Sequence, residues 1–430
     1  MAGEVKATPL SLELSADYIS RALDAMIDAG EGVGLALVHT HPPSPDGAGV
    51  AAFSLRDDWY DLRLVPTFLA TKRDALFGSI VIGAEPGTVD ARIWWNGDRG
   101  LSVQPADILR LVGPEVRFIE LRASKWRDHP DPTLMDRSTR IWGREGRRIL
   151  QNIRAGVVGL GGTGSITFLS LATMGIGKLN AWEKDMVGKE NLHRLLGVTK
   201  KDIGRAKGAV FKKAARRTAT ADPFELKVFD DWGTSAKGLR QLKDCDVIFS
   251  CVDKLAARVP ICDLAYAHLI PTLDMASWIH PNKGIVDAIM SQAQVLSPGL
   301  PCSWCSGTLS SRALTLEAQG TQQGVEHRAA YGLQVIETEG IEPSVLPLNL
   351  TSAGLALLQF MQVALHVTDR TPNKLRLMLP QWELDESDLA ARTSCSCMMD
   401  SALGDTLHIR PYAPPQDASG KSNSAGSGAN

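Results

Sequence analysis

The sequence predicts an α/β protein in which a Rossmann-like, doubly wound sheet follows a smaller α+β domain. From Ile153 to about Ala276, short apolar runs alternate with helical patterns, which is typical of parallel strands joined by helices on both faces of a sheet. A glycine-rich turn follows the first of these runs. Before about residue 125, β-like runs instead surround a single helical pattern.

The smaller domain is predicted to span residues 1–125. Its β-like runs are GVGLALVHTH, SIVIGA, ARIWWN and VRFIEL, and its one clear amphipathic helix runs from Ala16 to Ala29. The stretch from Ser124 to Arg148 is charged and contains two prolines, which indicates a linker that passes into a helix. We therefore assign residues 126–152 to a linker and a leading helix.

Residues 153–411 form the larger predicted domain. Its predicted strands are AGVVGL, KLNAWE, FELKVF and DVIFSCVD, and helices are expected from Thr163, over Ala206–Arg217 and after the last of these strands. Thr351–Val367 is a further apolar helix. Residues 412–430 are predicted to be a disordered tail, because the sequence from Pro415 onward is of low complexity.

Composition narrows the range of partners. Of the 430 residues, 44% are apolar and 22% are charged, and the net charge of −2 provides no basic field for nucleic acid or an anionic membrane. No apolar run reaches the roughly 18 residues that span a bilayer, and the N-terminal stretch lacks the pattern of a signal peptide. We expect a cytoplasmic protein. Seven cysteines favour metal binding and buried thiols over a disulfide framework.

A glycine-rich loop is the clearest binding motif. Its glycines, Gly159, Gly161, Gly162 and Gly164, lie where the run AGVVGL turns into a helix. Unpaired backbone N–H groups and the helix dipole favour a phosphate there, although a turn that binds nothing is the alternative. Glu183 lies 19 residues past Gly164, at the end of the next strand, where a carboxylate can accept hydrogen bonds from ribose hydroxyls. The two features together indicate an adenine nucleotide.

Further motifs accompany the loop in a fixed order. They are Arg137-Ser-Thr-Arg140 upstream and, downstream, Glu183-Lys-Asp-Met-Val, Asn191-Leu-His-Arg194, Gly204-Arg-Ala-Lys207 and the strand end Cys251-Val-Asp253. In this order, over about 120 residues, the sequence resembles the ThiF/MoeB-type superfamily, which includes the ubiquitin-activating enzymes. The resemblance implies the fold of that superfamily and ATP-dependent adenylation of a carboxylate.

The resemblance also implies a role for each residue at the nucleotide. Glu183 is expected to hold the ribose, and Asn191, Arg194 and Lys207 to surround the triphosphate. Standing alone, Arg194 and Lys207 would be solvated helix charges and Asn191 a turn residue. Their place within the ordered set favours the functional interpretation.

Two further residues complete the implied site. Asp253 is expected to hold Mg²⁺, and Arg140 to reach the partner's nucleotide across a homodimer interface. Cations and a metal suit this chemistry, because attack of a carboxylate on the α-phosphate builds charge and needs no protein nucleophile. The sequence departs from the family pattern at Glu183 and at three other positions, Ile141, Glu190 and Lys254. Lys254 is the departure that could disturb the metal site.

Two close pairs of cysteines predict a structural zinc clamp. Cys302 and Cys305 form a CxxC pair, and Cys395 and Cys397 form a CxC pair far along the chain. Buried thiols without a metal are the alternative. Residues 306–350, where several relatives carry a cysteine that forms a thioester, contain none. The chain is therefore expected either to stop at the acyl-adenylate or to pass the acyl group to a partner's thiol. The remaining cysteines, Cys245, Cys251 and Cys262, are expected to be small buried hydrophobic residues.

The smaller domain carries a second possible metal site. His39 and His41 lie at alternate positions on a strand, and Ser54 and Asp57 follow after a loop. Here the sequence resembles the JAB/JAMM metalloproteases, which implies zinc on the two histidines and Asp57, with Ser54 donating to the oxyanion. The loop is longer than in that pattern, and the acidic residues ahead of the helix, Glu4 and Glu13, are not expected to lie in a strand that would present a general base. An active protease and a fold that only binds a ubiquitin-like tail remain the two alternatives.

The resulting hypothesis is a homodimeric enzyme that uses ATP, Mg²⁺ and structural Zn²⁺ to adenylate the C-terminal carboxylate of a ubiquitin-like or sulfur-carrier protein. In this hypothesis the adenylating domain is fused to a JAB/JAMM-like domain. Such a fusion would suit a bacterial-type conjugation pathway with a downstream conjugating protein, and antiviral defence is one such pathway. The alternatives are a dinucleotide-dependent oxidoreductase and a non-catalytic scaffold that binds ubiquitin-like proteins.

Overall fold

The computed structural model describes residues 5–8, 11–28, 34–41, 51–72, 74–85, 88–122, 126–131, 133–282, 285–318, 344–387 and 389–414. The chain divides into two compact units. Unit 1 comprises residues 1–111, 117–126 and 403–408, and unit 2 comprises residues 112–116, 127–402 and 409–430. Glu4, most of the predicted tail and the central part of the segment that follows the CxxC pair lie outside the described residues.

Unit 1 is built on a four-stranded sheet in the order β3-β4-β5-β6. Its strands are β3 (Leu35–Thr40), β4 (Phe77–Ile82), β5 (Val89–Gly97) and β6 (Gly100–Pro105). β3 and β4 are parallel, whereas the other pairs are antiparallel. The helices are α1 (Ala16–Asp28) and α2 (Leu55–Thr71). Met26 of α1 and Phe68 of α2 pack with Phe77 and Trp94 of the sheet in the core of the unit.

Two expectations for this region were wrong. The sequence predicted one clear helix, but α2 is a second one. Its periodicity is interrupted by Pro66 inside the helix, yet Ser54 and Asp57 form a reciprocal capping box that stabilises its first turn. Glu13, expected outside any strand, lies in β2 (Ser11–Leu14), which pairs with β1 (Val5–Thr8).

A further two-stranded sheet consists of β7 (Ile108–Val112) and β8 (Val116–Glu120).

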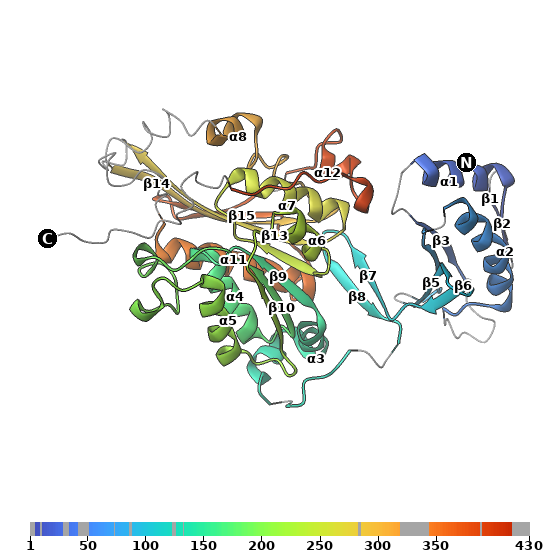
Figure 1. Ribbon diagram of the computed structural model, residues 1–430, viewed down its shortest axis with the longest axis horizontal. Coiled ribbons are helices and arrows are strands. Elements are labelled where there is room, and N and C mark those ends of the chain that lie inside the picture. Colours follow the sequence, from blue (N-terminus) through green and yellow to red (C-terminus); the bar gives the residue numbers. More distant parts are fainter. Residues whose placement is uncertain are drawn as a thin grey trace. The chain divides into compact units, whose positions relative to one another are not determined.

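Unit 2 contains an eight-stranded sheet in the order β11-β10-β9-β12-β13-β14-β15-β16 (Figure 1). The first five in this order run parallel: β11 (Glu225–Phe229), β10 (Lys178–Trp182), β9 (Arg154–Val158), β12 (Val247–Ser250) and β13 (Thr272–Asn282). β14 (Ile285–Leu296), β15 (Lys374–Leu379) and β16 (Glu383–Ser387) extend the sheet in antiparallel fashion. The predicted parallel sheet is therefore present, and the antiparallel extension was missed.

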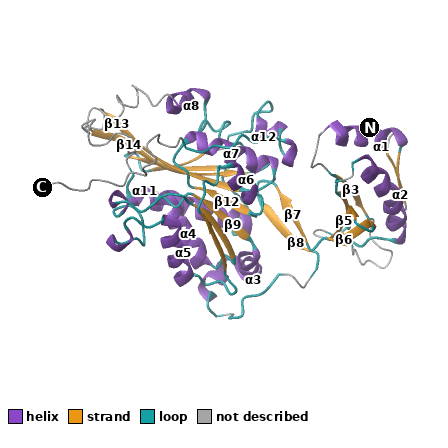
Figure 2. Cartoon of the chain, viewed as in Figure 1, coloured by secondary structure: helices purple, strands orange, loops and turns teal. Residues whose placement is uncertain are grey.

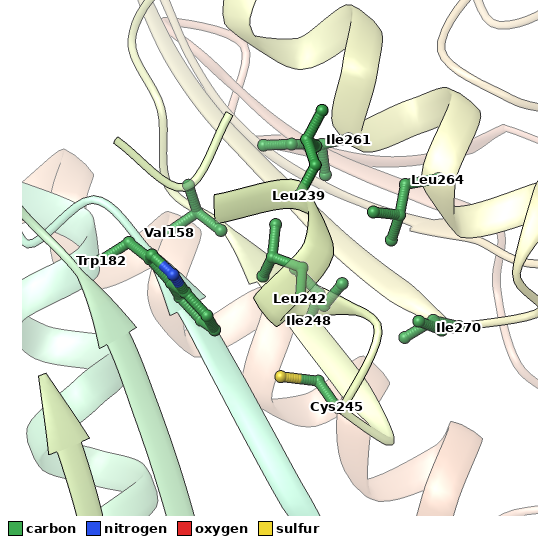
Figure 3. Packing of buried hydrophobic residues seen from close by; sticks show 9 residues of the cluster. All are labelled: Val158, Trp182, Leu239, Leu242, Cys245, Ile248, Ile261, Leu264 and Ile270. Carbon is green, nitrogen blue, oxygen red and sulfur yellow. The ribbon is translucent and has the colours of Figure 1, made fainter. Parts of the chain in front are cut away.

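Helices cover both faces of this sheet (Figure 2). The described helices of unit 2 are α3 (Asp136–Asn152), α4 (Gly162–Met174), α5 (Lys207–Thr218), α6 (Ala236–Leu242), α7 (Leu255–Ala267), α8 (Ser311–Ala318), α11 (Leu346–Leu365) and α12 (Ser396–Met399), of which α8 and α12 pack against α7. Short 3₁₀ turns lie at Lys189–Asn191 and Lys200–Asp202, and a third, at Gly404–Thr406, belongs to unit 1. On one face, Val158 and Ile248 of the strands pack against Leu242 of α6 and Leu264 of α7 (Figure 3). On the other face, the rings of Phe249 and Phe360 lie 5.5 Å apart, so α11 packs against β12. The period-2 alternation of Ile248 and Phe249 separates these two cores.

Two details concern the C-terminal part. Among the described residues, α11 is the one helix long and apolar enough to cross a membrane, and 56% of its most apolar window is buried inside the fold, as in a core helix. Tyr412, where the tail was predicted to begin, donates its backbone N–H to the carbonyl of Thr234. The first residues of the predicted tail are therefore held against unit 2.

Candidate active site

The glycine loop connects β9 to α4. Gly159 has a φ of 87°, a conformation that favours glycine. A Cβ at Gly164 would lie 1.9 Å from the carbonyl oxygen of Gly159, and one at Gly162 would lie 2.1 Å from Nδ2 of Asn349. A Cβ at Gly161 would meet nothing within 4 Å. Three of the glycines are therefore required by the protein's own backbone or packing, whereas Gly161 borders open space at a helix N-terminus, as a phosphate site requires.

Glu183 braces this loop. Its carboxylate is almost fully buried, with 6% of the residue exposed. One oxygen accepts the N–H of Leu160 at 2.7 Å, and the other accepts the N–H of Asp185 at 2.8 Å. Burial raises the pKa of Glu183, and the nearby Lys207 ammonium opposes that rise. The residue predicted to bind ribose thus also holds the backbone on either side of the loop.

Lys207 is the first residue of α5 and is buried. Its Nζ pairs with Oδ2 of Asp185 at 2.9 Å, and its field reaches Glu183. A buried ammonium is retained where a carboxylate compensates its desolvation. Asp185, half exposed, was quoted in the Glu183 motif but received no role from the sequence. The structure joins it to Lys207 at the end of β10.

Asp253 lies just beyond the end of β12 and is exposed. The strand end is next to the glycine loop, because a Cβ on Gly159 would lie 3.2 Å from the carbonyl oxygen of Cys251. The chain before Asp253 is fixed by Arg258, which donates to the carbonyl of Val252 at 2.6 Å and pairs with Asp274 in the interior. Asp253 therefore presents an accessible carboxylate at the same edge of the sheet as the phosphate loop.

The remaining predicted nucleotide residues are placed less closely. Asn191 is buried, and its Oδ1 accepts the N–H of Gly188, so it stabilises the turn after β10. Arg194 lies in the same turn and is partly exposed. Arg140 lies on α3 with 76% of its side chain exposed and pairs with Asp136 of the same helix. Its predicted role across a dimer interface stays a prediction.

Asn349, in the first turn of α11, was missed by the sequence analysis. It is buried against the loop, and its Oδ1 accepts a hydrogen bond from the Thr163 hydroxyl at 3.3 Å. The two residues are 186 positions apart, so no local pattern could reveal the contact. The glycine at position 162 is explained by this side chain.

The four cysteines of the predicted zinc clamp come together. The sulfur atoms of Cys302, Cys305, Cys395 and Cys397 all lie within 4.8 Å of one another. The closest pairs are Cys302 with Cys395 at 3.5 Å and Cys305 with Cys397 at 3.8 Å. Four thiolates at this spacing suit a tetrahedral zinc ion, and a CxC pair serves as well as CxxC here. A hydrogen bond from Cys262 lowers the pKa of Cys302 to about 5, whereas burial raises the pKa of Cys395 and of Cys397, so a bound cation would have to stabilise the thiolates of this cluster.

The other three cysteines match their prediction only in part. Cys245 and Cys262 are buried, and Cys251 is partly buried. Burial raises the pKa of Cys245 to about 12, so this thiol stays neutral. Cys262 does more than fill space, because its thiol contacts Cys302 of the cluster. All seven thiols are free of disulfides.

The three side chains of the second predicted metal site come together in unit 1. Nε2 of His39 lies 3.0 Å from Oδ1 of Asp57, and Nε2 of His41 lies 3.2 Å from Oδ2. The three ligand atoms lie within 4.8 Å of one another. Burial would raise the pKa of Asp57, but hydrogen bonds from Ser54 and the fields of the two histidines hold it below its ordinary value. Two imidazoles and an ionised carboxylate are a donor set that zinc accepts, with a fourth position left for water.

Comparisons with known proteins place unit 2 in a family. A family model described as the ThiF family matches residues 135–397. A SAMP-activating enzyme E1 of Haloferax volcanii is 27% identical over 183 residues, which cover 41% of this chain and 63% of that protein. A sulfur carrier protein adenylyltransferase of Thermus thermophilus is 30% identical over 124 residues, which cover 29% of this chain and 45% of that protein. The matched segment spans less than two thirds of either relative.

Solved structures give a weaker likeness. MccB of E. coli, in a structure with ATP, has a TM-score of 0.47 and 14% identity, covering 62% of this chain and 74% of that one. MccB alone has a TM-score of 0.49 and 13% identity, covering 68% and 78%.

Proposed function

The chain belongs to the ThiF family, a family of adenylyltransferases, and from this premise we propose that it adenylates the C-terminal carboxylate of a ubiquitin-like or sulfur-carrier protein. The observation that carries the proposal is the convergence of the open glycine Gly161, the buried Lys207 and the exposed Asp253 at one edge of the sheet. The relatives named a sulfur carrier protein adenylyltransferase and a SAMP-activating enzyme indicate the class of substrate.

In the proposed reaction, the residues of this chain bind, orient and stabilise charge. Bound ATP would supply the adenylyl group: the carrier's carboxylate oxygen bonds to the α-phosphorus, the bond from the α-phosphorus to the bridging oxygen breaks, and the β- and γ-phosphates leave as pyrophosphate. Backbone N–H groups around Gly161 hold phosphate oxygens, and Lys207 stabilises the negative charge that develops between the phosphates. Asp253 would hold Mg²⁺ through its carboxylate oxygens. Because the carrier's carboxylate oxygen is itself the nucleophile, the site needs no catalytic cysteine or general base.

Glu183, Asn191 and Arg194 complete the proposed site. Glu183 has two further lone-pair directions for ribose hydroxyls besides those taken by the Leu160 and Asp185 N–H groups. Asn191 shapes the turn that carries Arg194, and the guanidinium is proposed to contact the triphosphate.

The four cysteines are proposed to hold a structural zinc ion. They join the loop at residues 302–305 to the segment around α12, which are distant in sequence. Such a closed site stabilises the fold and takes no part in the chemistry. Because the CxxC-to-α11 segment contains no cysteine, the proposed enzyme either stops at the acyl-adenylate or passes the acyl group, with release of AMP, to a thiol of a downstream conjugating protein.

Unit 1 is proposed to be a JAB/JAMM-like domain that binds zinc through His39, His41 and Asp57. Zinc on these ligands would polarise a bound water. The Ser54 hydroxyl donates to Oδ2 of Asp57 at 2.7 Å, so it would have to turn from Asp57 to donate to an oxyanion. Its proposed substrate is the same extended tail, either cleaved or only bound. We also propose a homodimer in which Arg140 serves the partner's nucleotide, and a bacterial-type conjugation pathway, including antiviral defence.

Exchange of radiolabelled pyrophosphate into ATP tests the function. The wild-type chain is incubated with a panel of ubiquitin-like and sulfur-carrier proteins, each with a free or an amidated C-terminus. Exchange with a free C-terminus, its absence with the amidated one and its loss in Asp253→Ala support the proposal. Failure with every carrier, together with calorimetric binding of NAD(H) in preference to ATP, would establish the oxidoreductase alternative. Binding of a carrier without nucleotide binding would establish the scaffold.

A further inference from the structure

The N-terminus of α7 lacks a cap from its own sequence. α7 begins at Leu255, and its N-cap residue, Lys254, makes no side-chain capping hydrogen bond. An ammonium group has three donors and no acceptor, so a lysine cannot satisfy the unpaired N–H groups of a first helical turn. Those groups need an acceptor from elsewhere in the fold.

Glu317 of α8 supplies that acceptor. Its Oε1 accepts the N–H of Leu255 at 2.8 Å, and its Oε2 accepts the N–H of Ala256, also at 2.8 Å. Both carboxylate oxygens are used, and the negative charge lies at the positive end of the helix dipole. Glu317 therefore caps α7 from a position 62 residues away in sequence.

The cap lies beside the residue proposed to hold Mg²⁺. Asp253 is two positions before the start of α7. On its other side, the carbonyl of Val252 is held by Arg258 at 2.6 Å. The short segment that contains Asp253 and Lys254 is thus fixed at both ends, by Arg258 before it and by Glu317 after it.

The charges of Glu317, Asp253 and Lys254 all affect the pKa of Tyr412. Burial raises the pKa of the Tyr412 hydroxyl, the carboxylates of Glu317 and Asp253 raise it further, and Lys254 lowers it. Glu317, Asp253 and Lys254 therefore act on one small region beside the N-terminus of α7.

We propose that Glu317 is a positioning residue for Asp253: by capping α7 in place of Lys254, it fixes the turn that presents the Asp253 carboxylate to Mg²⁺. The inference rests on the proposed metal role of Asp253. It makes α8, the helix that follows the CxxC loop, part of the metal-binding machinery. A change that moves α8 would remove the cap and loosen Asp253, so metal binding at the nucleotide would respond to the state of α8.

The test measures the affinity for ATP by calorimetry, once with excess Mg²⁺ and once with EDTA. The ratio of the two dissociation constants isolates the contribution of the metal. In Glu317→Ala we expect this ratio to fall about three- to tenfold, because Mg²⁺ binding must then order the turn itself, at a free-energy cost similar to the stability that a helix cap contributes, while the dissociation constant in EDTA is unchanged. Glu317→Gln keeps the packing and one acceptor oxygen, and is expected to lose about half of that effect on a free-energy scale; it gives the same answer if the alanine variant folds poorly.

Two further variants separate positioning from general stability. In Lys254→Asn the new side-chain oxygen can accept an N–H of the first turn of α7. The double variant Lys254→Asn, Glu317→Ala should therefore have nearly the same ratio of ATP dissociation constants as Lys254→Asn alone. Asp246→Ala is the matched control, because that carboxylate also accepts a backbone N–H, of Arg154 at 2.8 Å, but at the start of β9, away from the nucleotide edge. The control should lower the melting temperature and leave the ratio unchanged.

The outcomes are distinct. Equal losses with and without Mg²⁺ in Glu317→Ala, or no recovery in the double variant, would overturn the positioning role. A wild-type protein whose ATP affinity gains from Mg²⁺, with the same gain in Glu317→Ala, would also overturn it and leave the proposed function intact. A wild-type protein that gains nothing from Mg²⁺ would overturn the metal role of Asp253 itself, and the inference with it.

Discussion

Replacement of Gly161 by alanine separates what the ligand needs in the glycine loop from what the fold needs. Gly161 is the N-cap of α4 with φ −72° and ψ −156°, extended values that alanine adopts. A Cβ there meets no protein atom within 4 Å. The variant is therefore expected to fold with little net change in stability. The lost conformational freedom of the unfolded chain contributes about 0.4–1 kcal/mol, and the poorer preference of alanine than glycine for an N-cap position offsets that gain.

The same methyl group should weaken ATP binding. A phosphate oxygen accepts a backbone N–H at about 2.7–3.2 Å, and the added Cβ of residue 161 would occupy the open space that such an oxygen must enter. Loss of one hydrogen bond to a charged group costs about 1.5–3 kcal/mol, which corresponds to roughly a ten- to hundredfold weaker dissociation constant. Affinity should thus fall while stability changes little.

Calorimetric titration with ATP and a thermal melt measure both quantities on the same preparation. Gly354→Ala is the control, since Gly354 lies in α11 and a Cβ there also meets nothing within 4 Å; it should stabilise without changing ATP affinity. Gly164→Ala should instead destabilise, because its Cβ would lie 1.9 Å from a backbone oxygen. ATP binding by Gly161→Ala as tight as that of wild type would refute the phosphate site at this loop.

The remaining predictions concern metals, pH and the dimer. Metal analysis by plasma emission should find two zinc ions per wild-type chain and one per chain in each of the variants Cys395→Ser and Asp57→Asn. Loss of both ions in either variant would show that the two sites are not independent. Burial lowers the pKa of Lys374 from 10.5 to about 8. Between these pH values the unfolded chain holds a proton that the folded chain has released, so the free energy of unfolding should rise with pH. In urea titrations Lys374→Met should abolish that rise, and an identical rise in the variant would contradict the assignment to Lys374. Equal amounts of Arg140→Ala and Asp253→Ala, mixed and allowed to exchange subunits, should recover about a quarter of the wild-type exchange activity if the arginine serves the partner's site, whereas no recovery would make Arg140 local.

The sequence predicted those features that local order decides. The glycine loop could be placed between β9 and α4 because a strand, a glycine turn and a helix are adjacent in the chain. Its companions Glu183 and Lys207 lie at the next strand end and the next helix start, so the topology of a parallel sheet brings them to the same edge. The four-cysteine cluster could be predicted because the spacing within each cysteine pair is itself a ligand pattern.

What the sequence did not reveal depends on contacts between distant segments. β14 pairs with β15, although the segment that contains α11 separates these two strands in the sequence. No local pattern distinguishes them from strands that would continue the parallel sheet. α2 was hidden by Pro66, although a capping box at Ser54 compensates for the weak pattern. Asn349 and Glu317 act only through partners far away in sequence, and each resembles an ordinary helix residue until the fold places it.

Glu183 serves the fold, and its proposed role at the ribose would use the same carboxylate. Its two oxygens accept the N–H groups of Leu160 and Asp185, so its carboxylate ties the glycine loop to the end of β10. A carboxylate has about four lone-pair directions, and two remain for ribose hydroxyls. Burial raises its pKa, while Lys207 favours the ionised form. Nucleotide binding at this position would therefore use a carboxylate that is already oriented, which reduces the conformational entropy lost on binding.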